Sequence, residues 1–174
     1  FVADPLESFV IYKDSTFAMM REAQRRGHQI VACEPCHISW QSGGKVKARV
    51  RHITLTGDKD RWFEETQSTR AVLADFGAIV MRKDPPFDSE FFYATHMLGQ
   101  AEREGAKVFN KPGALREHPE KLAIMEFAQF ISPTLVTRSA EDIRAFHAEH
   151  QDIILKPLDG MGGMGIFRVG EDGR

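Results

Sequence analysis

The chain has 174 residues, of which 42% are hydrophobic and 28% are charged, and its formal net charge is −2. This composition is typical of a soluble globular protein, and it argues against a broad basic surface for nucleic acid or membranes. No apolar run approaches the roughly 20 residues that a membrane helix needs. The chain starts at Phe1 and not at Met, which we interpret as a missing amino-terminal strand and not as a signal peptide.

Strands and helices are predicted to alternate from the start of the chain. Asp14 or Ser15 can cap a helix that ends at Gly27. An apolar strand is expected at 29–33, and a hairpin with a Gly-Gly turn at 38–51. Residues 57–75 are polar, and we expect them to be irregular, with Trp62 and Phe63 against the core.

A second strand and helix follow. A buried strand is predicted at 78–81, a helix from Asp88 to about Glu104, and another strand at 107–110. This alternation predicts a parallel α/β fold, in which ligands bind beyond the carboxyl ends of the strands. The polar residues at those ends are therefore candidates for binding, although charged surface loops are an equally good interpretation. They are Arg82, Lys83, Asp84, Asn110 and Lys111.

A second domain is predicted to begin at residue 116, so that the chain divides into 1–115 and 116–174. Pro119 suits the first position of a helix that runs to Phe130, with Leu122, Met125 and Phe130 along one face. Residues 135–137 are expected to form a short strand. Ser139 can cap the next helix, with Asp142 at the spacing of a capping box.

A lysine and a run of glycines mark the last part of the chain, from 152 to 169. Lys156 ends an apolar run, the loop that follows contains Gly160, Gly162, Gly163 and Gly165, and a second apolar run comes next. We predict a strand, a glycine turn and a strand, because glycines allow tight turns and let backbone N–H groups approach an anion. A lysine beside such a loop supplies a point charge for a phosphate.

Other interpretations of these glycines stay open. The spacing from Gly160 to Gly165 fits a dinucleotide fingerprint, but that motif requires a helix after the last glycine. A Walker A loop is excluded, because no Gly-Lys-Ser/Thr follows. On the sequence pattern alone, an ordinary glycine-rich hairpin turn fits about as well as a phosphate-binding loop.

Two cysteines, Cys33 and Cys36, form a Cys-x-x-Cys pair. A redox pair would sit at the entrance to a helix, and a zinc site would need four ligands, whereas only His28 and His37 are near in sequence. We therefore assign the pair no metal or redox role. Two free thiols fit a reducing cytoplasm.

Four stretches of the chain together resemble the prokaryotic glutathione synthetases, which are ligases of the ATP-grasp superfamily. The resemblance spreads over nearly the whole chain in the family's order. The stretches are Tyr12 to Met19 with Glu22 to Gly27, Val80-Met-Arg-Lys-Asp-Pro-Pro-Phe-Asp88, Asn110-Lys-Pro with Glu120-Lys-Leu122, and Ile153-Ile-Leu-Lys-Pro-Leu-Asp-Gly-Met-Gly-Gly163.

The resemblance implies a Rossmann-like pre-ATP-grasp domain followed by the beginning of an ATP-grasp domain. It implies a cytoplasmic homo-oligomer that joins γ-glutamylcysteine and glycine with ATP through an acyl phosphate. Its ATP-binding residues map onto Lys121, Lys156 and the lid residues Gly160, Met161, Gly162 and Gly163. Its peptide-substrate side maps onto Lys13, Asp14, Ser15, Arg82, Lys83, Asp84 and Asn110.

The resemblance also implies Mg²⁺, but the family's metal ligands lie in a carboxyl-terminal half that this sequence does not contain. We therefore predict no metal site in this chain, and we expect that the chain alone cannot complete the reaction. Two alternatives stay open: a non-catalytic nucleotide-binding module, and an ATP-grasp ligase for another amino acid or dipeptide. An NAD-dependent oxidoreductase would rest only on the glycine spacing.

Overall fold

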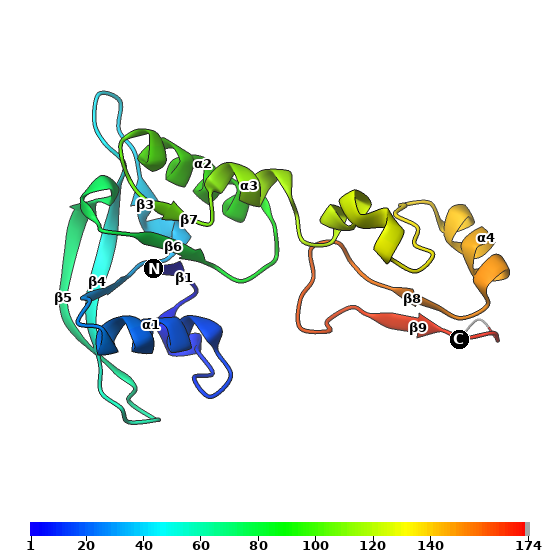
Figure 1. Cartoon of the computed structure of the whole chain (residues 1–174), viewed down its shortest axis with the longest axis horizontal. Coiled ribbons are helices and arrows are strands. Elements are labelled where there is room, and N and C mark those ends of the chain that lie inside the picture. The colour runs from blue at the N-terminus through cyan, green and yellow to red at the C-terminus, as the bar shows by residue number, and fades with distance from the viewer. Residues whose placement is uncertain (173–174) are drawn as a thin grey trace. The chain divides into compact units, whose positions relative to one another are not determined.

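The computed structural model describes residues 1–172 of the chain. The chain divides into two compact units (Figure 1). The first unit consists of Phe1–Asp84 and Asp88–Glu117, and the second consists of Pro85–Phe87 and His118–Arg174. The prediction of a mixed α/β fold is confirmed by the elements of the first unit, which combine helices with a parallel sheet.

A parallel three-stranded sheet carries the candidate substrate residues of the first unit. Its order is β1-β6-β7, with β1 at Val2–Ala3, β6 at Ile79–Arg82 and β7 at Val108–Phe109. Both pairings are parallel, so the carboxyl ends of all three strands lie at the same edge. Residues that follow these strands are therefore brought toward one another, as predicted.

Two capped helices pack against the sheets of this unit. Helix α1 (Ser15–Arg25) is capped by Asp14, and helix α2 (Ser89–Arg103) is capped by Asp88. The caps and the carboxyl-terminal ends of both helices were predicted. Gly27, just after α1, has a φ of 81°, which is favourable for glycine at the end of a helix. A short helix, α3 (Pro112–Glu117), was not predicted.

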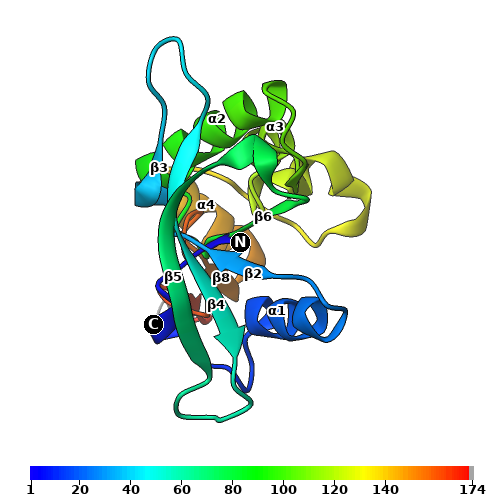
Figure 2. The ribbon, with the colours of Figure 1, turned by 90° about the vertical axis from the view of Figure 1, so that its left-hand side faces the viewer.

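An antiparallel sheet forms the rest of the first unit. Strands β2 (Ile30–Ala32) and β3 (Ile38–Ser39) pair with one edge of β4 (Lys47–Leu55), and β5 (Phe63–Val72) pairs with the other edge. Figure 2 shows β4 and β5 as a long curved ribbon. The expectation that 57–75 is irregular is therefore wrong. β5 is mostly exposed and polar, so its periodicity carries no strand signal, and the backbone pairing with β4 holds it.

The buried side chains of the first unit form two clusters on opposite sides of the sheets. Leu98, Ala101 and Val108 belong to the cluster beneath α2, and Met20, Ile53 and Trp62 belong to the cluster beneath α1. Figure 1 shows α1 on one side and α2 with α3 on the other. Short 3-10 turns connect the elements at Leu6–Ser8, Pro35–His37 and Leu73–Asp75.

The second unit contains helix α4, a hairpin and an irregular 3-10 segment, η4. Helix α4 (Ala140–His150) is capped by Ser139, whose Oγ accepts from the backbone N–H of Asp142 at 3.2 Å. The reciprocal half of the predicted capping box is absent. The Asp142 carboxylate accepts from the Thr137 hydroxyl instead, because aspartate is one methylene shorter than the usual glutamate.

Two other expectations for the second unit are wrong. Residues Leu122–Phe130 form η4 and not a regular helix from Pro119, with a kink at Phe127 and with Met125 and Phe130 exposed. Residues 135–137 form no strand within the described chain.

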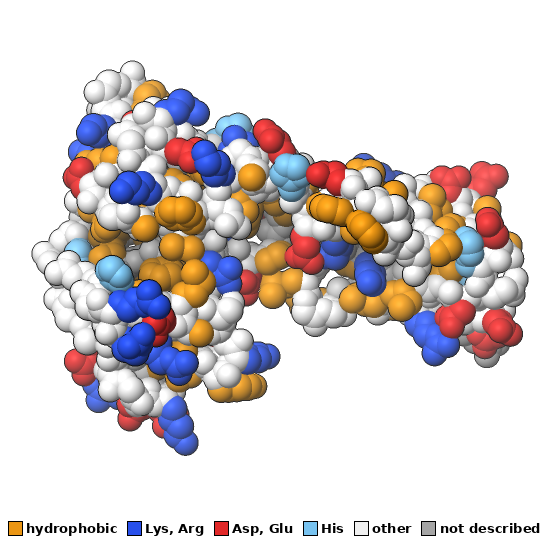
Figure 3. Space-filling model, viewed as in Figure 1, with side chains coloured by type: hydrophobic (Ala, Val, Ile, Leu, Met, Phe, Trp, Pro, Cys, Tyr) orange, Lys and Arg blue, Asp and Glu red, His pale blue; other side chains and the backbone are white. Residues whose placement is uncertain are grey.

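The predicted hairpin is confirmed. Strand β8 (Ile153–Leu155) pairs antiparallel with β9 (Phe167–Val169), and the glycine loop connects them. On the face seen in Figure 3, basic and acidic side chains are intermingled, in keeping with the small net charge. Within residues 1–172, no helix has both the length and the apolar character needed to cross a bilayer.

Candidate functional site

The first group of candidate residues lies at the carboxyl ends of β1 and β6. Parallel pairing places Ala3 opposite Arg82, so Asp4 and Lys83 are the next residues on neighbouring strands. The amino-terminal end of α1 lies beside them, with the Asp14 Oδ1 atom accepting from the backbone N–H of Phe17 at 2.8 Å. The sequence-predicted segments 13–15 and 82–84 therefore meet in one place.

Arg82 makes the contacts that join these segments. Its Nε donates to the Thr16 hydroxyl at 3.1 Å, and its Nη2 donates to the Ser15 hydroxyl at 2.6 Å. Thr16 is 4% exposed, so this part of the arginine is fixed against a buried partner. Within residues 1–172, Arg82 forms no ion pair with a carboxylate. Its positive charge is thus oriented but not neutralised.

Asp4 holds the loop that follows β6. Its Oδ2 accepts from the backbone N–H of Asp84 at 2.8 Å, and its Oδ1 forms an ion pair with Lys83 Nζ at 2.8 Å. Lys83 also donates to the carbonyl oxygen of Asp84. Lys83 is therefore engaged in holding the loop.

Asp4 and Thr16 were not among the predicted site residues. Asp4 could have been found, because it directly follows a short apolar strand and so lies at a carboxyl end, as Arg82 does. For Thr16 the sequence contained no such signal. A threonine hydroxyl at the start of a helix commonly hydrogen-bonds the nearby backbone, so its position alone does not indicate a binding site.

A small pocket of about 80 Å³ opens between these residues. The predicted residues Asp14, Arg82 and Asp84 line it, whereas Lys13, Ser15, Lys83 and Asn110 do not. Asn110 is exposed just beyond β7. The full lining of the pocket is Asp4, Ser8, Phe9, Asp14, Thr16, Arg82 and Asp84.

The second group of candidate residues is the glycine loop between β8 and β9. Gly162 and Gly163 have φ values of 61° and 82°, a region that side-chain-bearing residues rarely adopt. A Cβ atom on Gly160 would lie 2.8 Å from Pro157 Cγ and 3.2 Å from the Met164 carbonyl oxygen. Glycine is therefore required here for two reasons, backbone conformation and close approach.

Both candidate lysines of the second unit lie at this loop. Lys156 directly follows β8 and is exposed, and Lys121 reaches the loop from a segment far earlier in the chain, its Nζ donating to the carbonyl oxygen of Gly160. Two ammonium groups beside a loop of small residues can bind phosphate oxygens. Sequence reasoning connected Lys121 to the loop only through the family resemblance; the hydrogen bond makes that connection in the molecule.

The structure argues against two of the competing interpretations, the dinucleotide fingerprint and the redox pair. A strand and not a helix follows Gly165, so the dinucleotide fingerprint fails its structural requirement. Burial raises the pKa of the Cys33 thiol to about 11, which is opposite to the shift of a redox-active cysteine. His147 contacts the Gly170 carbonyl, and the His150 ring lies 4.3 Å from the Phe146 ring, tilted by 56°. Within residues 1–172, no group of three His, Cys, Asp or Glu side chains could hold a metal ion.

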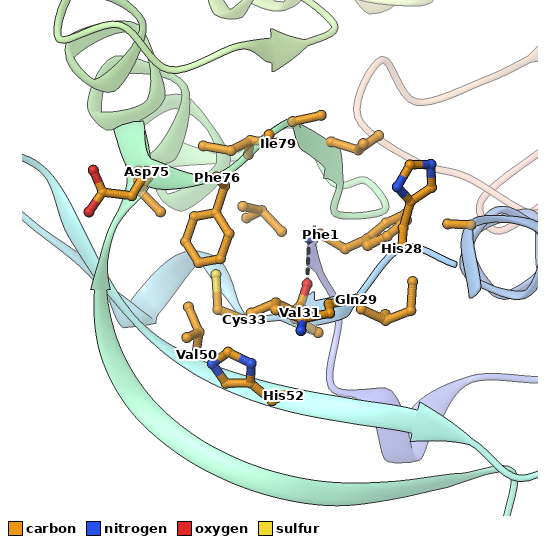
Figure 4. A pocket seen from close by; sticks show the side chains of 18 of the residues that line it. Phe1, His28, Gln29, Val31, Cys33, Val50, His52, Asp75, Phe76 and Ile79 are labelled. Carbon is orange, nitrogen blue, oxygen red and sulfur yellow. Dashed lines mark hydrogen bonds between the residues drawn. The ribbon is translucent and has the colours of Figure 1, made fainter. Parts of the chain in front are cut away.

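A cavity of about 750 Å³ in the first unit is a separate feature (Figure 4). None of the predicted site residues lines it. Its walls are mainly apolar, with Val31, Phe76 and Ile79 among them, and Figure 4 shows Asp75 and His28 on different sides of it.

Comparison with known proteins agrees with these motifs. Residues 1–116 match the model of the prokaryotic glutathione synthetase N-terminal domain, and residues 120–174 match that of the prokaryotic glutathione synthetase ATP-grasp domain. The glutathione synthetase of Ralstonia nicotianae is 54% identical over 173 residues, 99% of this chain and 53% of the relative.

Two further relatives have the same coverage. The glutathione synthetase of Neisseria meningitidis serogroup B is 49% identical over 175 residues, 98% of this chain and 54% of the relative. That of Yersinia pestis is 50% identical over 171 residues, 98% of this chain and 53% of the relative. The chain therefore spans about half the length of the curated relatives it matches.

Proposed function

Because the chain belongs to the prokaryotic glutathione synthetase family, we propose that its protein is an ATP-dependent ligase that joins γ-glutamylcysteine and glycine. In this reaction an oxygen of the cysteinyl carboxylate attacks the γ-phosphorus of ATP, and ADP leaves. The glycine amine then attacks the carbonyl carbon of the acyl phosphate, phosphate leaves, and the amine loses a proton. The product is glutathione.

The main support for this proposal is the hydrogen bond from Lys121 to the Gly160 carbonyl oxygen, which brings the lysine to the glycine loop. We assign ATP binding to Lys121, Lys156 and the loop Gly160-Met-Gly-Gly163, because these groups combine positive charge with a backbone that a phosphate can approach closely. Phosphoryl transfer depends mainly on positioning and on neutralising charge. The loop would also exclude water from an acyl phosphate, which hydrolysis would otherwise destroy.

We assign the dipeptide to the group of residues at the carboxyl ends of β1 and β6. Ser15, Arg82 and Asp84 offer a cation, a hydroxyl and a carboxylate within one region, and γ-glutamylcysteine carries two carboxylates and an ammonium group. Asp14 contributes as the cap of α1, and Lys83 contributes by holding the loop. Lys13 and Asn110 are weaker members of this set, because they neither line the pocket nor, within residues 1–172, hold a residue that lines it, as Ser15 and Lys83 do.

Other parts of the proposal rest on the family alone. We propose residues 1–115 as the substrate domain and 116–174 as the first part of the ATP-grasp domain, in a cytoplasmic homo-oligomer. Mg²⁺ is the expected metal, and within residues 1–172 no group of three His, Cys, Asp or Glu side chains fits it. We also propose that the chain by itself does not complete the reaction, because it spans about half the length of its relatives.

The test is ATP consumption by the full-length protein with γ-glutamylcysteine, glycine and Mg²⁺. We expect phosphate release that needs both amino-acid substrates and that falls about 100-fold or more in Lys156→Ala, as when one charge-stabilising donor is removed. Lys45→Ala is the matched control, because Lys45 is an exposed lysine in the first unit. Its activity should stay unchanged.

Two results would contradict the proposal. Tight ATP binding without glycine-dependent turnover would leave a nucleotide-binding module. Turnover with a different amino acid or dipeptide, but not with γ-glutamylcysteine, would identify a different ATP-grasp ligase.

A further inference from the structure

One face of the sheet formed by β3, β4 and β5 carries three cations close together. Arg49 on β4 and Arg70 on β5 are directly opposite each other in the antiparallel register, and Lys47 lies two residues from Arg49 on β4. Opposed residues of an antiparallel pair share a face, as do residues two apart on one strand. The burial pattern agrees, because Lys47 and Arg49 are exposed while Ala48 between them is buried. We call Lys47, Arg49 and Arg70 the basic patch.

The chain does not neutralise the basic patch. Within residues 1–172, none of its three side chains forms an ion pair with a carboxylate. Arg51, the next cation on this face of β4, is different, because it pairs with Glu7 and with Glu65, each at 2.8 Å. Like charges directly opposite each other destabilise a sheet. The basic patch therefore lowers the stability of the sheet, and no carboxylate among the described residues offsets that cost.

A hydroxyl group holds Arg70 in place. The Nη2 atom of Arg70 donates to Ser39 Oγ at 3.1 Å. Ser39 lies on β3 opposite Lys47, and β3 and β5 pair with the two edges of β4. The side chain of Arg70 therefore crosses the face of β4, and its guanidinium lies on the side of Lys47. A hydroxyl orients a guanidinium but, being neutral, leaves its positive charge available to a ligand.

The basic patch offers the donors that a tetrahedral oxyanion binds. Arg49 and Arg70 carry guanidinium N–H groups, and Lys47 carries an ammonium group. The Ser39 hydroxyl accepts from Arg70 and still has its own proton to donate. Guanidinium groups bind phosphate oxygens through paired hydrogen bonds, and an ammonium group adds a point charge. A phosphate group has enough oxygens to meet all of these donors at once.

The dimensions of the basic patch suit one anionic group and not an extended polyanion. Neighbouring strands lie about 4.8 Å apart, and residues two apart on a strand are separated by about 6.8 Å. Cations at these spacings surround an area comparable to one phosphate group. The chain as a whole has a formal net charge of −2, so it has no general excess of positive charge with which to hold a nucleic acid.

We propose that the basic patch, together with Ser39, binds a phosphate group, either as free phosphate or as the dianionic end of a phosphorylated small molecule. This site uses none of the residues assigned above to ATP or to the dipeptide, and it does not depend on the proposed function. A bound dianion would also stabilise the sheet, because it removes the repulsion between Arg49 and Arg70 and binds only the folded chain.

The test is a titration of the full-length protein with inorganic phosphate, followed by the backbone amide shifts in NMR spectra. A low salt concentration of about 20 mM limits the screening of exposed charges. We expect saturable shifts at Ser39, Lys47, Arg49 and Arg70, with a Kd on the order of 1–10 mM, as for a few exposed ion pairs. Sodium chloride at equal ionic strength should give no such saturation. Phosphate shifts that are confined to the glycine loop, or spread over all basic residues, would overturn the proposal.

Two substitutions that keep the net charge distinguish a defined site from general charge attraction. Arg70→Lys loses the guanidinium fork, and Ser39→Ala releases Arg70. Each should weaken phosphate binding about 3-fold or more, and Arg49→Gln, which removes a charge, about 10-fold or more. Arg61→Gln is the matched control, because Arg61 is an exposed arginine at the other end of the β4–β5 hairpin. It should change the Kd by less than about 2-fold.

Equal binding by the wild type, Arg70→Lys and Ser39→Ala would overturn the proposal, since charge alone would then explain the affinity. An equal loss in Arg61→Gln and Arg49→Gln would overturn it for the same reason. The position of the shifts in the wild type does not require any variant to fold. The amide spectrum of each variant shows whether its fold is kept.

A second ligand identifies the source of the phosphate group. Glycerol 3-phosphate carries the same dianion on a small molecule. Binding within about 3-fold of inorganic phosphate would support a site for a phosphorylated small molecule, whereas binding about 10-fold weaker would support a site for free phosphate.

A second copy of the chain is the alternative occupant of this face. Sedimentation velocity at several protein concentrations detects such an association. If the wild type associates, Arg49→Gln weakens the association, and phosphate gives no saturable shifts at the basic patch, the proposal is overturned and this face is an interface between copies.

Discussion

The two units of the chain differ in where their apolar side chains lie. Among the described residues, every buried apolar side chain belongs to the first unit except Ile153, which is 7% exposed. The second unit exposes large apolar side chains, among them Met125, Phe130, Met164 and Phe167. Burial of apolar surface is the main favourable term in folding. The first unit therefore builds its core from residues of this chain, whereas the second unit buries only Ile153 among its described residues, and the chain spans about half the length of its relatives.

The largest effect should come from the same truncation made once in each unit. Leu98 in α2 is fully buried, whereas Leu135 in the second unit is 41% exposed. Leu98→Ala should lower the free energy of unfolding of the 174-residue chain by about 2–5 kcal/mol, because it leaves a cavity. Leu135→Ala should lower it by less than about 0.5 kcal/mol. Urea unfolding followed by circular dichroism measures both. Equal effects would contradict the difference between the units.

The cysteines test whether the core of the first unit excludes water. Cys33 is buried and Cys36, three residues later, is exposed. Because burial raises the pKa of the Cys33 thiol from 9.0 to about 11, Cys33 carries about 100-fold less thiolate than an ordinary cysteine near neutral pH. Iodoacetamide at pH 8 should therefore modify Cys36 first, with Cys33 modified only after urea is added. Mass spectrometry follows both sites, and modification of Cys33 at the same rate would show an open core.

Removing one helix cap in each unit tests the same difference with a smaller loss in the free energy of unfolding. Asp88 caps α2 in the first unit, and Ser139 caps α4 in the second. Each change to alanine should cost about 1 kcal/mol. In the first unit we expect the loss to appear in global unfolding, because α2 covers the core. In the second we expect faster amide hydrogen exchange confined to α4. Exchange measured by mass spectrometry distinguishes these patterns, and a global response to Ser139→Ala would be the contrary result.

The smallest effect is expected at the base of the glycine hairpin. Arg168 makes two hydrogen bonds to Asp152, at 3.0 and 2.7 Å, and these hold the pKa of the Asp152 carboxyl below its ordinary 3.8. Because the folded pKa is lower, any stabilisation is present above pH 3.8 and is lost as the pH falls through the folded value. The pair is exposed, so the effect on stability should be slight. An NMR titration of Asp152 beside Arg168→Gln checks the direction, since the variant should titrate at higher pH.

Local signals in the sequence predicted those parts of the fold that local chemistry decides. The caps at Asp14, Asp88 and Ser139 were predicted correctly, because an acceptor side chain directly before an apolar stripe satisfies free N–H groups of the first helical turn. The glycine hairpin was also predicted correctly, since only glycine readily tolerates the positive φ angles of this loop.

The parts that were missed depend on partners distant in sequence. Strand β5 is a polar segment that becomes a strand because β4 pairs with it. Residues 135–137 have strand-like composition but pair with no strand among the described residues. At the candidate substrate site, the sequence named Ser15 and Arg82 but not the contact between them. Thr16 entered the site only through packing across more than 60 residues, whereas the place of Asp4 directly after β1 could have indicated it.

The contact between Arg82 and Ser15 has a consequence for the order of folding. The β4–β5 hairpin closes locally, with Leu55 opposite Phe63, whereas β1 must find β6 with Val2 opposite Met81. Contacts of large sequence separation form late, because a long loop must be closed first. We therefore expect the amides of β4 to be protected from exchange before those of β6 during refolding, which pulsed hydrogen labelling can follow. The charged pocket would then exist only in molecules whose first unit is complete, so a ligand bound there would report that folding has finished.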